Sequence, residues 1–268
     1  MAIGVHIINL LGQQRVTRVI GWLAGTRFPG FVVRMAVRVY CRIYKIDLEQ
    51  FDFDIRQVKT FNEFFTRKWK PGVRQFESGI ASPAEGYYFN GGLLKASKII
   101  QCKGKLADQR KITTFEPFAT GSFATIYLSP GDYHRVHAPF DMRIDRIAYI
   151  PGKLYPVNEK SVLKISQLYC KNERVVLSGS CSYGRFDFVF IGAMIVGKTV
   201  LSFIEDWDAR IKKRRGFEEW VSYDLRKSEE LGYFELGSTV LLLMDNRILD
   251  TITLEPVARV LLGQHLCG

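Results

Sequence analysis

The sequence predicts an α+β protein in which N-terminal amphipathic helices precede a mainly antiparallel β-sandwich or barrel-like core. Three observations support this fold class. With 47% hydrophobic and 24% charged residues in 268, the chain has the composition of a folded protein, which excludes disordered and low-complexity classes. Apolar and basic residues follow helical spacing in residues 1–45. From about residue 80, short β-branched and aromatic runs alternate with Gly and Pro, and most connections are too short for crossover helices.

The first segment, residues 1–45, carries seven Lys or Arg and no Asp or Glu, within a chain of formal net charge +11. Gly30 marks a break between two expected helices. Arg34, Arg38 and Arg42 recur every fourth residue along one helical stripe. Cations beside Trp and Phe on an amphipathic helix are typical of an interfacial membrane element. The alternative is a helical hairpin that docks on its own domain and leaves a solvated basic face.

An acidic linker leads to a short aromatic helix. Thr60 and Glu63 have the spacing of a capping box, and we expect the helix to continue until Pro71 stops it. Four aromatic residues share one face of this helix: Phe61, Phe64, Phe65 and Trp69. We therefore divide the chain into a helical, membrane-associating region of residues 1–75 and a β-rich core of residues 76–268.

Six segments of the core predict strands, because they are rich in β-branched or aromatic residues and are bounded by Gly or Pro. They are Ser122–Leu128, Phe140–Ile150, Arg174–Leu177, Phe186–Ile191, Val196–Phe203 and Thr239–Met244. The five cysteines are scattered, which favours a reducing compartment over a disulfide framework or a zinc ribbon. No run of about 18 apolar residues occurs, so we expect the protein in the cytosol or on a cytosolic membrane face.

Two of the four histidines, His134 and His137, lie in the segment Asp132 to Pro139. In an extended chain, residues three apart point to opposite faces, so the two rings would do different jobs. They are a weak metal pair, since no third histidine is near and the cysteines are dispersed, and we expect no metal site. Taken alone, each histidine is more often structural than catalytic.

A second candidate site is the run Glu235 to Thr239, directly before an apolar strand. A turn that leads into a strand accounts for a Gly-Ser pair by itself. A Ser after Gly can also attack the preceding carbonyl, because Gly leaves that carbonyl unshielded and permits unusual backbone angles. Cleavage between Gly237 and Ser238 would need a base for the hydroxyl and donors for the oxyanion.

These segments, in this order, resemble the phosphatidylserine decarboxylase proenzyme family, of the membrane-associated bacterial type. The family's autocleavage motif Leu-Gly-Ser-Thr is intact at Leu236 to Thr239. Further matches cover nearly the whole chain: Phe64–Arg67, Lys70–Gly72, Ser82–Gly86, Lys103–Gly104, Tyr133–Pro139, Pro156–Asn158, Asn172–Val175, Gly192–Ala193 and Val196–Gly197. The ordered set is far more specific than the tetrapeptide alone.

The resemblance implies a pyruvoyl-dependent phosphatidylserine decarboxylase, a carboxy-lyase of phospholipid biosynthesis that is made as a zymogen. Ser238 would attack the Gly237 carbonyl, and β-elimination from the resulting ester would divide the protein into chains 1–237 and 238–268. The second chain would begin with a pyruvoyl group derived from Ser238. This cofactor would form a Schiff base with the amine of phosphatidylserine and accept electrons as CO2 leaves, which gives phosphatidylethanolamine.

The family's site residues carry over by position. His137 matches the base for Ser238, and His134 matches the histidine associated with substrate and decarboxylation. Thr239 would offer a hydroxyl or an amide to the oxyanion, by our own inference. Glu85 departs from the family, which carries Asp there. Either carboxylate can orient a histidine, but the extra methylene moves it by roughly 1 Å, which can cost about a hundredfold in rate.

Two other functions stay open at this point. A catalytically silent or unprocessed relative would keep the fold and bind anionic membranes through residues 1–45. The net charge and the cluster Arg210 to Arg215 suggest a nucleic-acid binder, but no nucleic-acid motif surrounds the cluster, so we expect no nucleic-acid partner. For the decarboxylase, the expected partners are phosphatidylserine, an anionic membrane surface and the other cleavage product, with homo-oligomerisation open. It would be peripheral, on the cytoplasmic side of the cell membrane.

Overall fold

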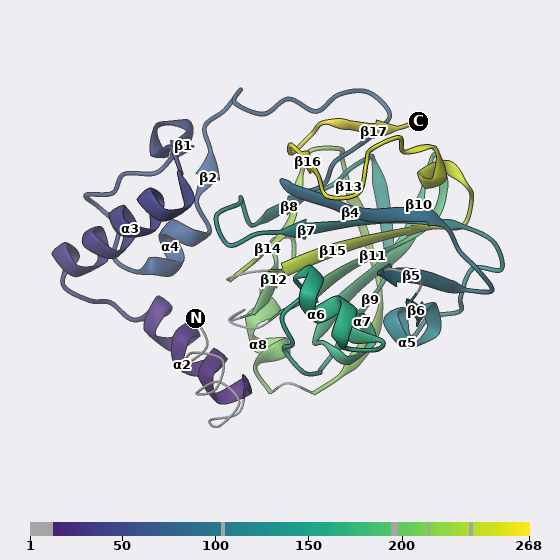
Figure 1. Cartoon of the computed structure of the whole chain (residues 1–268), viewed down its shortest axis with the longest axis horizontal. Helices are drawn as coiled ribbons and strands as arrows, with labels where there is room; N and C mark the ends of the chain where they lie inside the picture. Colours follow the sequence, from purple (N-terminus) through teal and green to yellow (C-terminus); the bar gives the residue numbers. More distant parts are fainter. Residues whose placement is uncertain (1–12, 103–104, 194–197, 214, 236–237) are drawn as a thin grey trace.

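The computed structural model describes residues 13–102, 105–193, 198–213, 215–235 and 238–268. Helices and two short strands from residues 13–69 form one side of the molecule, and a β-rich core forms the other (Figure 1). The strands of the core pair antiparallel. The α+β fold class predicted from the sequence is therefore confirmed.

Two helices open the described chain, α2 (Gln13–Gly25) and α3 (Gly30–Tyr44). The break between them covers residues 26–29, and Gly30 is the first residue of α3. Val33 and Val37 bury the inner side of α3 in a small apolar cluster with α4, and the left-handed backbone of Lys45 ends the helix. The helical pair separated near Gly30 is thus confirmed.

The aromatic helix α4 (Phe61–Phe65) begins as the capping-box pattern predicts. The Thr60 hydroxyl accepts a hydrogen bond from the Glu63 amide at 3.2 Å. The Glu63 carboxylate in turn accepts from the Lys59 amide at 2.8 Å, one residue earlier than in a standard capping box. Two otherwise unpaired amides at the start of α4 are satisfied in this way.

The prediction that this helix continues to Trp69 is wrong. Lys68–Trp69 forms strand β2, which pairs with β1 (Phe51–Asp52). The Trp69 ring stacks on the Phe51 ring at 4.0 Å between centroids. An aromatic pair across two strands stabilises the extended backbone, and this long-range contact overrides the helical spacing of the aromatic residues.

An eight-stranded sheet forms the centre of the core. In spatial order it contains β13 (Phe217–Leu225), β9 (Met142–Ile150), β10 (Arg174–Cys181), β11 (Gly184–Gly192), β15 (Ser238–Met244), β7 (Ser122–Leu128), β4 (Gly86–Leu93) and β16 (Ala258–Val260). Within the described chain β13 and β16 do not pair with each other, so the sheet is open rather than a closed barrel. Five of the six predicted strands are confirmed here.

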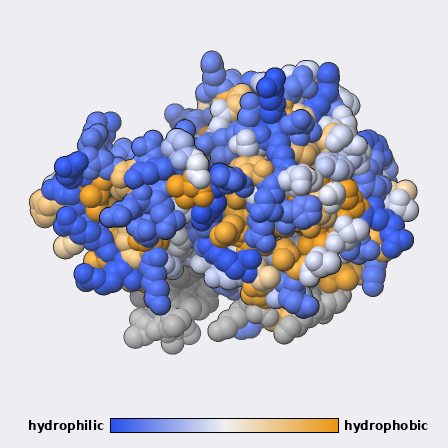
Figure 2. Space-filling view, turned by 90° about the horizontal axis from the view of Figure 1, so that it is seen from above, coloured by the Kyte–Doolittle hydropathy of each residue, from blue (hydrophilic) through white to orange (hydrophobic). Residues whose placement is uncertain are grey.

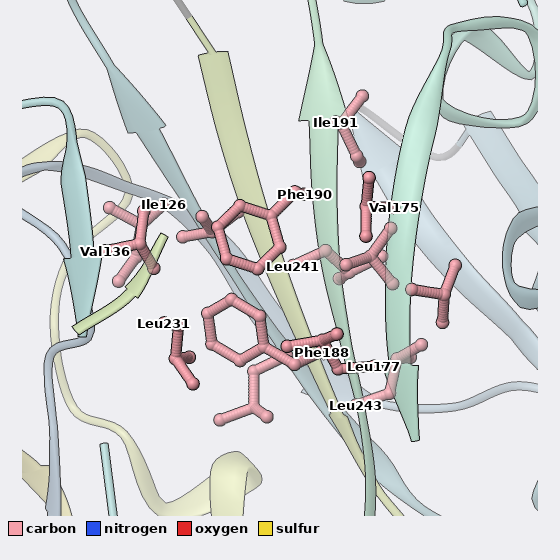
Figure 3. Close-up of a cluster of buried hydrophobic side chains, with 14 of the residues drawn as sticks. Ile126, Val136, Val175, Leu177, Phe188, Phe190, Ile191, Leu231, Leu241 and Leu243 are labelled. Carbon is pink, nitrogen blue, oxygen red and sulfur yellow. The ribbon is translucent and has the colours of Figure 1, made fainter. Parts of the chain in front are cut away.

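The sixth predicted strand appears as β12 (Thr199–Leu201), and its first residues fall in 194–197, outside the described residues. It forms a second, three-stranded sheet with β14 (Glu230–Phe234) and β8 (Arg135–His137). Val136 and Leu231 of this small sheet point toward Phe188 and Phe190 of the large one (Figure 3). The two layers enclose the main apolar core.

Short elements complete the fold. The remaining strands are β3 (Ile80–Ala81), which pairs with β17 (His265–Cys267), and β5 (Lys98–Cys102), which pairs with β6 (Lys105–Asp108). The remaining helices are η1 (Leu48–Gln50), α5 (Gln109–Thr113), α6 (Glu159–Lys164), α7 (Leu168–Lys171), α8 (Trp207–Lys212) and η2 (Ile248–Thr251). No helix within the described ranges is long and apolar enough to cross a membrane.

Candidate active site

Ser238 is the first residue of β15 and lies between two neighbouring strands. Leu128 of β7 is opposite on one side, and Gly192 of β11 is opposite on the other. The Ser238 side chain is fully buried, and its hydroxyl has no hydrogen-bond partner in the part of the chain that the structure describes. A buried hydroxyl without a partner costs about 1–3 kcal/mol. Leu236 and Gly237, which complete the predicted cleavage motif, lie outside the described residues.

His134 is also fully buried. Its Nδ1 is 2.9 Å from the Asp132 carbonyl oxygen, and its ring packs at 4.3 Å between centroids on Phe65 of α4. A carbonyl only accepts, so Nδ1 carries the proton and Nε2 carries the lone pair. That Nε2 has no partner among the described residues. Burial lowers the pKa of His134 to about 3, so the ring is neutral at physiological pH.

His137 has different surroundings, as the three-residue spacing predicts. Its Nδ1–H donates to the Ser228 carbonyl at 2.7 Å, and the Tyr133 hydroxyl, 3.2 Å away, donates to its Nε2. Burial lowers the pKa of His137, so this ring is neutral as well. It lines a pocket of about 380 Å³ together with Phe76 and Glu230.

The two histidines differ in how they face Ser238. His134 directly precedes β8, and its carbonyl accepts from the Phe234 amide at 3.0 Å, so the extended chain places His134 on the same side as Val136. Val136 packs with Ile126, which shares a face of the large sheet with Ser238 (Figure 3). His134 therefore lies on the side of β8 turned to the layer that contains Ser238, and His137 lies on the other side.

Glu85, the residue at which the sequence departs from the family, is held by two arginines. Arg74 binds its carboxylate with Nε at 2.8 Å and Nη2 at 3.1 Å, and Arg259 binds it at 3.3 Å. Within the described ranges no hydrogen bond joins Glu85 to His137. The two are connected through the backbone, since the His137 amide donates to the Pro83 carbonyl at 2.8 Å.

Thr239 lies next to Ser238 on β15 and is buried, and its hydroxyl also has no partner among the described residues. Because side chains alternate along a strand, the Thr239 side chain points to the opposite face of the sheet from Ser238. The hydroxyl of Thr239 is therefore directed away from Ser238, and its amide belongs to the ladder between β15 and β11, where Thr239 pairs with Ile191.

Sequence reasoning missed four residues at this site: Arg74, Tyr133, Ser228 and Arg259. Tyr133 lies inside the quoted histidine motif, so its position was a usable signal. Ser228 binds His137 through its main-chain carbonyl. Every residue type has that group, so the sequence gives no signal for this contact. The arginines lie 11 and 174 residues from Glu85, and only the folded chain brings them together.

The basic cluster Arg210 to Arg215 lies partly on α8. Arg210 forms ion pairs with Asp206 and Glu219, and Arg214 lies outside the described residues. Lys198 links α8 to the site, because its ammonium contacts Asp208 and is 3.6 Å from Glu235. The helix that begins this cluster is therefore tied to the residue three positions before Ser238.

Comparisons with known proteins show the family of this sequence. The phosphatidylserine decarboxylase family model matches residues 61–268, which include α4 and the whole β-rich core. A curated phosphatidylserine decarboxylase proenzyme of Variovorax paradoxus (strain S110) is 37% identical, over 87% of this chain and 86% of its own. That of Anaeromyxobacter sp. (strain K) is 34% identical, over 98% of this chain and 97% of its own. The family match and these relatives span most of the sequence, and the chain belongs to the phosphatidylserine decarboxylase family.

Proposed function

We propose that the protein is a phosphatidylserine decarboxylase that makes its own pyruvoyl group by cleaving the bond between Gly237 and Ser238. The observation that carries this proposal is the buried hydroxyl of Ser238, which has no partner among the described residues and belongs to an intact family motif. Cleavage would produce chains 1–237 and 238–268. The pyruvoyl group at the start of the second chain would then serve the assembled enzyme in converting phosphatidylserine to phosphatidylethanolamine and CO2.

The cleavage chemistry uses the chain's own atoms. Ser238 Oγ attacks the Gly237 carbonyl carbon, the peptide C–N bond breaks, and an ester with a free Ser238 amine forms. Loss of the Ser238 α-proton breaks the Cβ–Oγ bond, which releases the Gly237 carboxylate and leaves dehydroalanine. Its tautomer hydrolyses to the pyruvoyl group and ammonia. Each stage needs a neutral base near residue 238.

We assign that base to His137, because it matches the family's base by its position in the motif. Since His137 lies on the side of β8 away from the Ser238 layer, its ring has to move toward Ser238 before cleavage. Its Nδ1–H is committed to the Ser228 carbonyl, which leaves the lone pair on Nε2, and burial keeps the ring neutral. In this structure the Tyr133 hydroxyl donates to that lone pair, so it has to turn away before His137 takes the proton of Ser238.

The residues around Ser238 fit a pyruvoyl group at that position. The neighbour across β11 is Gly192, which presents no side chain, and the neighbour across β7 is the apolar Leu128. When formed, the group supplies an electrophilic carbonyl that takes up the electron pair as CO2 leaves. His134 lies on the same side, and its unprotonated Nε2 accepts a hydrogen bond from the polar headgroup of the substrate.

Glu85 supports His137 through the backbone rather than through the ring. Its ion pairs with Arg74 and Arg259 fix the segment that begins at Pro83, and the Pro83 carbonyl binds the His137 amide. The longer side chain of Glu reaches both guanidinium groups. In this arrangement the carboxylate at position 85 positions the backbone that binds His137. It does so without the direct contact to the histidine ring that the family's Asp implies.

The surface of α2 and α3 supports attachment to an anionic membrane. Phe31, Met35, Val39 and Ile43 recur every fourth residue and are exposed, next to the stripe of Arg34, Arg38 and Arg42. Val19, Trp22, Leu23 and Phe28 add exposed apolar area. Figure 2 shows apolar residues among hydrophilic ones over this side of the molecule. Apolar residues bordered by cations suit the headgroup boundary of the cytoplasmic leaflet.

Intact-mass spectrometry of the purified protein tests this function. The expected masses are those of residues 1–237 and of a pyruvoyl-blocked chain 238–268, and vesicles with phosphatidylserine should yield CO2. Ser238→Ala should remain one chain. A single unprocessed mass for the natural sequence would instead support the silent relative that binds membranes, and a free serine amine on the small chain would reject the mechanism.

A further inference from the structure

Asn172 holds three backbone groups of two separate segments. Its side chain is fully buried, and its Nδ2 donates to the Tyr155 carbonyl and to the Gly192 carbonyl, each at 2.8 Å. Its Oδ1 accepts from the Tyr155 amide at 3.1 Å. Both amide hydrogens and one oxygen lone pair are therefore used, which no other side chain of this size provides.

Gly192 is the residue opposite Ser238 across β11 and β15. Its amide donates to the Glu173 carbonyl at 2.9 Å, so both of its backbone groups turn toward the segment of Asn172. Gly192 and Ser238 thus form a non-hydrogen-bonded antiparallel pair, in which Cα atoms approach to about 4.5 Å. Without the bond from Asn172, the peptide after Gly192 loses this anchor, and because glycine permits many backbone angles its carbonyl can rotate toward the Ser238 hydroxyl.

We infer that Asn172 is a positioning residue for self-cleavage, because it holds the Gly192 carbonyl away and keeps the Ser238 hydroxyl free to attack. The inference rests on the proposed function. The hydroxyl of Ser238 is buried and unpartnered in the described chain, and a buried hydroxyl strongly favours any acceptor in reach. A Ser238 hydroxyl bound to the Gly192 carbonyl would be turned from the Gly237 carbonyl and protected from the base.

Replacement by Asp gives a specific test. Asn172→Asp keeps the shape and the acceptor but removes both donors, so at neutral pH a carboxylate faces the carbonyls of Tyr155 and Gly192. Burial and these carbonyls raise the pKa of the new carboxyl, and protonation at acid pH returns one donor. Arg174, the buried cation bound to the Asn172 carbonyl, has its pKa lowered to about 10 and stays charged throughout. Asn172→Leu removes the donors at every pH.

The matched control is Asn158→Asp. Asn158 also belongs to a family motif, but it is the exposed N-cap of α6, where its Oδ1 accepts from the Ser161 amide at 3.1 Å. A carboxylate caps a helix as well as an amide does. Cleavage rates would be measured on refolded proenzymes at pH 8.0 and pH 5.5 by denaturing gel, with circular dichroism and thermal unfolding as checks on folding. Asn172→Ser, which keeps one donor, is the second variant if the others do not fold.

Relative to the natural protein, Asn172→Asp should cleave about 30-fold more slowly at pH 8.0 and only about threefold more slowly at pH 5.5. Asn172→Leu should be slow at both, and Asn158→Asp normal. Wild-type rates in every folded Asn172 variant, or equal deficits of the Asp and Leu variants at both pH values, would overturn the inference. If the natural protein itself does not cleave, the proposed function is rejected. Because the natural protein is measured beside the variants, this outcome is distinct from a failure of the inference about Asn172.

Discussion

Both histidine rings donate their Nδ1–H to a main-chain carbonyl, His134 to Asp132 and His137 to Ser228. A carbonyl fixes the tautomer but, unlike a carboxylate, brings no charge to stabilise an imidazolium. Burial lowers the pKa of both rings. The site therefore favours neutral imidazoles, which suits an acyl shift and a decarboxylation in an apolar layer.

Alanine replacement should separate the two histidines. His137→Ala should slow cleavage at least about 100-fold, because general base catalysis contributes that much. His134→Ala should cleave and then decarboxylate poorly, because a headgroup acceptor is lost after the cofactor forms. Denaturing gels and CO2 release from phosphatidylserine vesicles measure the two steps. The reverse result would assign the base to His134, whose Nε2 has no partner among the described residues.

Glu85→Gln should slow cleavage about tenfold, since the amide keeps the size of the side chain but loses the ion pairs with Arg74 and Arg259. We expect Glu85→Asp to be slow as well, because a shorter carboxylate does not reach both Arg74 and Arg259. The control is Asp54→Asn, which removes the exposed pair with Arg56 and should have no effect. Faster cleavage by Glu85→Asp would favour direct contact of a carboxylate with His137.

At the scale of elements, α3 has a dual role. Its inner side packs Val33 and Val37 against the fold, and its outer side carries the exposed apolar stripe. The Tyr40 hydroxyl also donates to the Pro130 carbonyl at 2.6 Å, in the loop that leads from β7 to His134. One helix thus faces the proposed membrane and contacts the loop before the candidate active site.

Replacing two residues of the outer stripe should release the protein from vesicles. Met35 and Ile43 are 60% and 66% exposed, so Met35→Asp with Ile43→Asp should leave folding unchanged while apolar burial and charge attraction are both reduced. Sedimentation with anionic vesicles measures the bound fraction, which should fall at least about fivefold. Trp220→Ser is the control, since Trp220 is 75% exposed on β13. Release by Trp220→Ser alone would place the membrane contact on the β-rich core.

At the scale of the whole molecule, the proposed cleavage point lies at one end of a central strand. β15 is hydrogen-bonded between β11 and β7 in the eight-stranded sheet, and the same chain 238–268 also supplies β16 and β17. Arg259 adds ion pairs to Glu85 and Asp132, which lie before the proposed cleavage point. Cutting the backbone before β15 leaves all of these contacts in place.

The two cleavage products should therefore remain a heterodimer under native conditions. Residues Val240 to Met244 are fully buried or nearly so, and separating the chains would expose them together with two strand edges. Gel filtration should give one peak that contains both chains, and only denaturant should separate them. A small chain that is lost on native gel filtration would contradict this assembly.

The sequence by itself determined the α+β class, most strand positions, the start of α4 and the family, because these follow from short-range periodicity, caps and contiguous motifs. Only the tertiary structure decided where α4 ends, which groups hold Glu85 and His137, and which backbone groups Asn172 binds. Trp69 stacks on Phe51, Glu85 meets Arg259 across 174 residues, and Asn172 meets Gly192 across 20. A local pattern reports what a segment favours alone, whereas these contacts depend on which segments the folded sheets bring side by side.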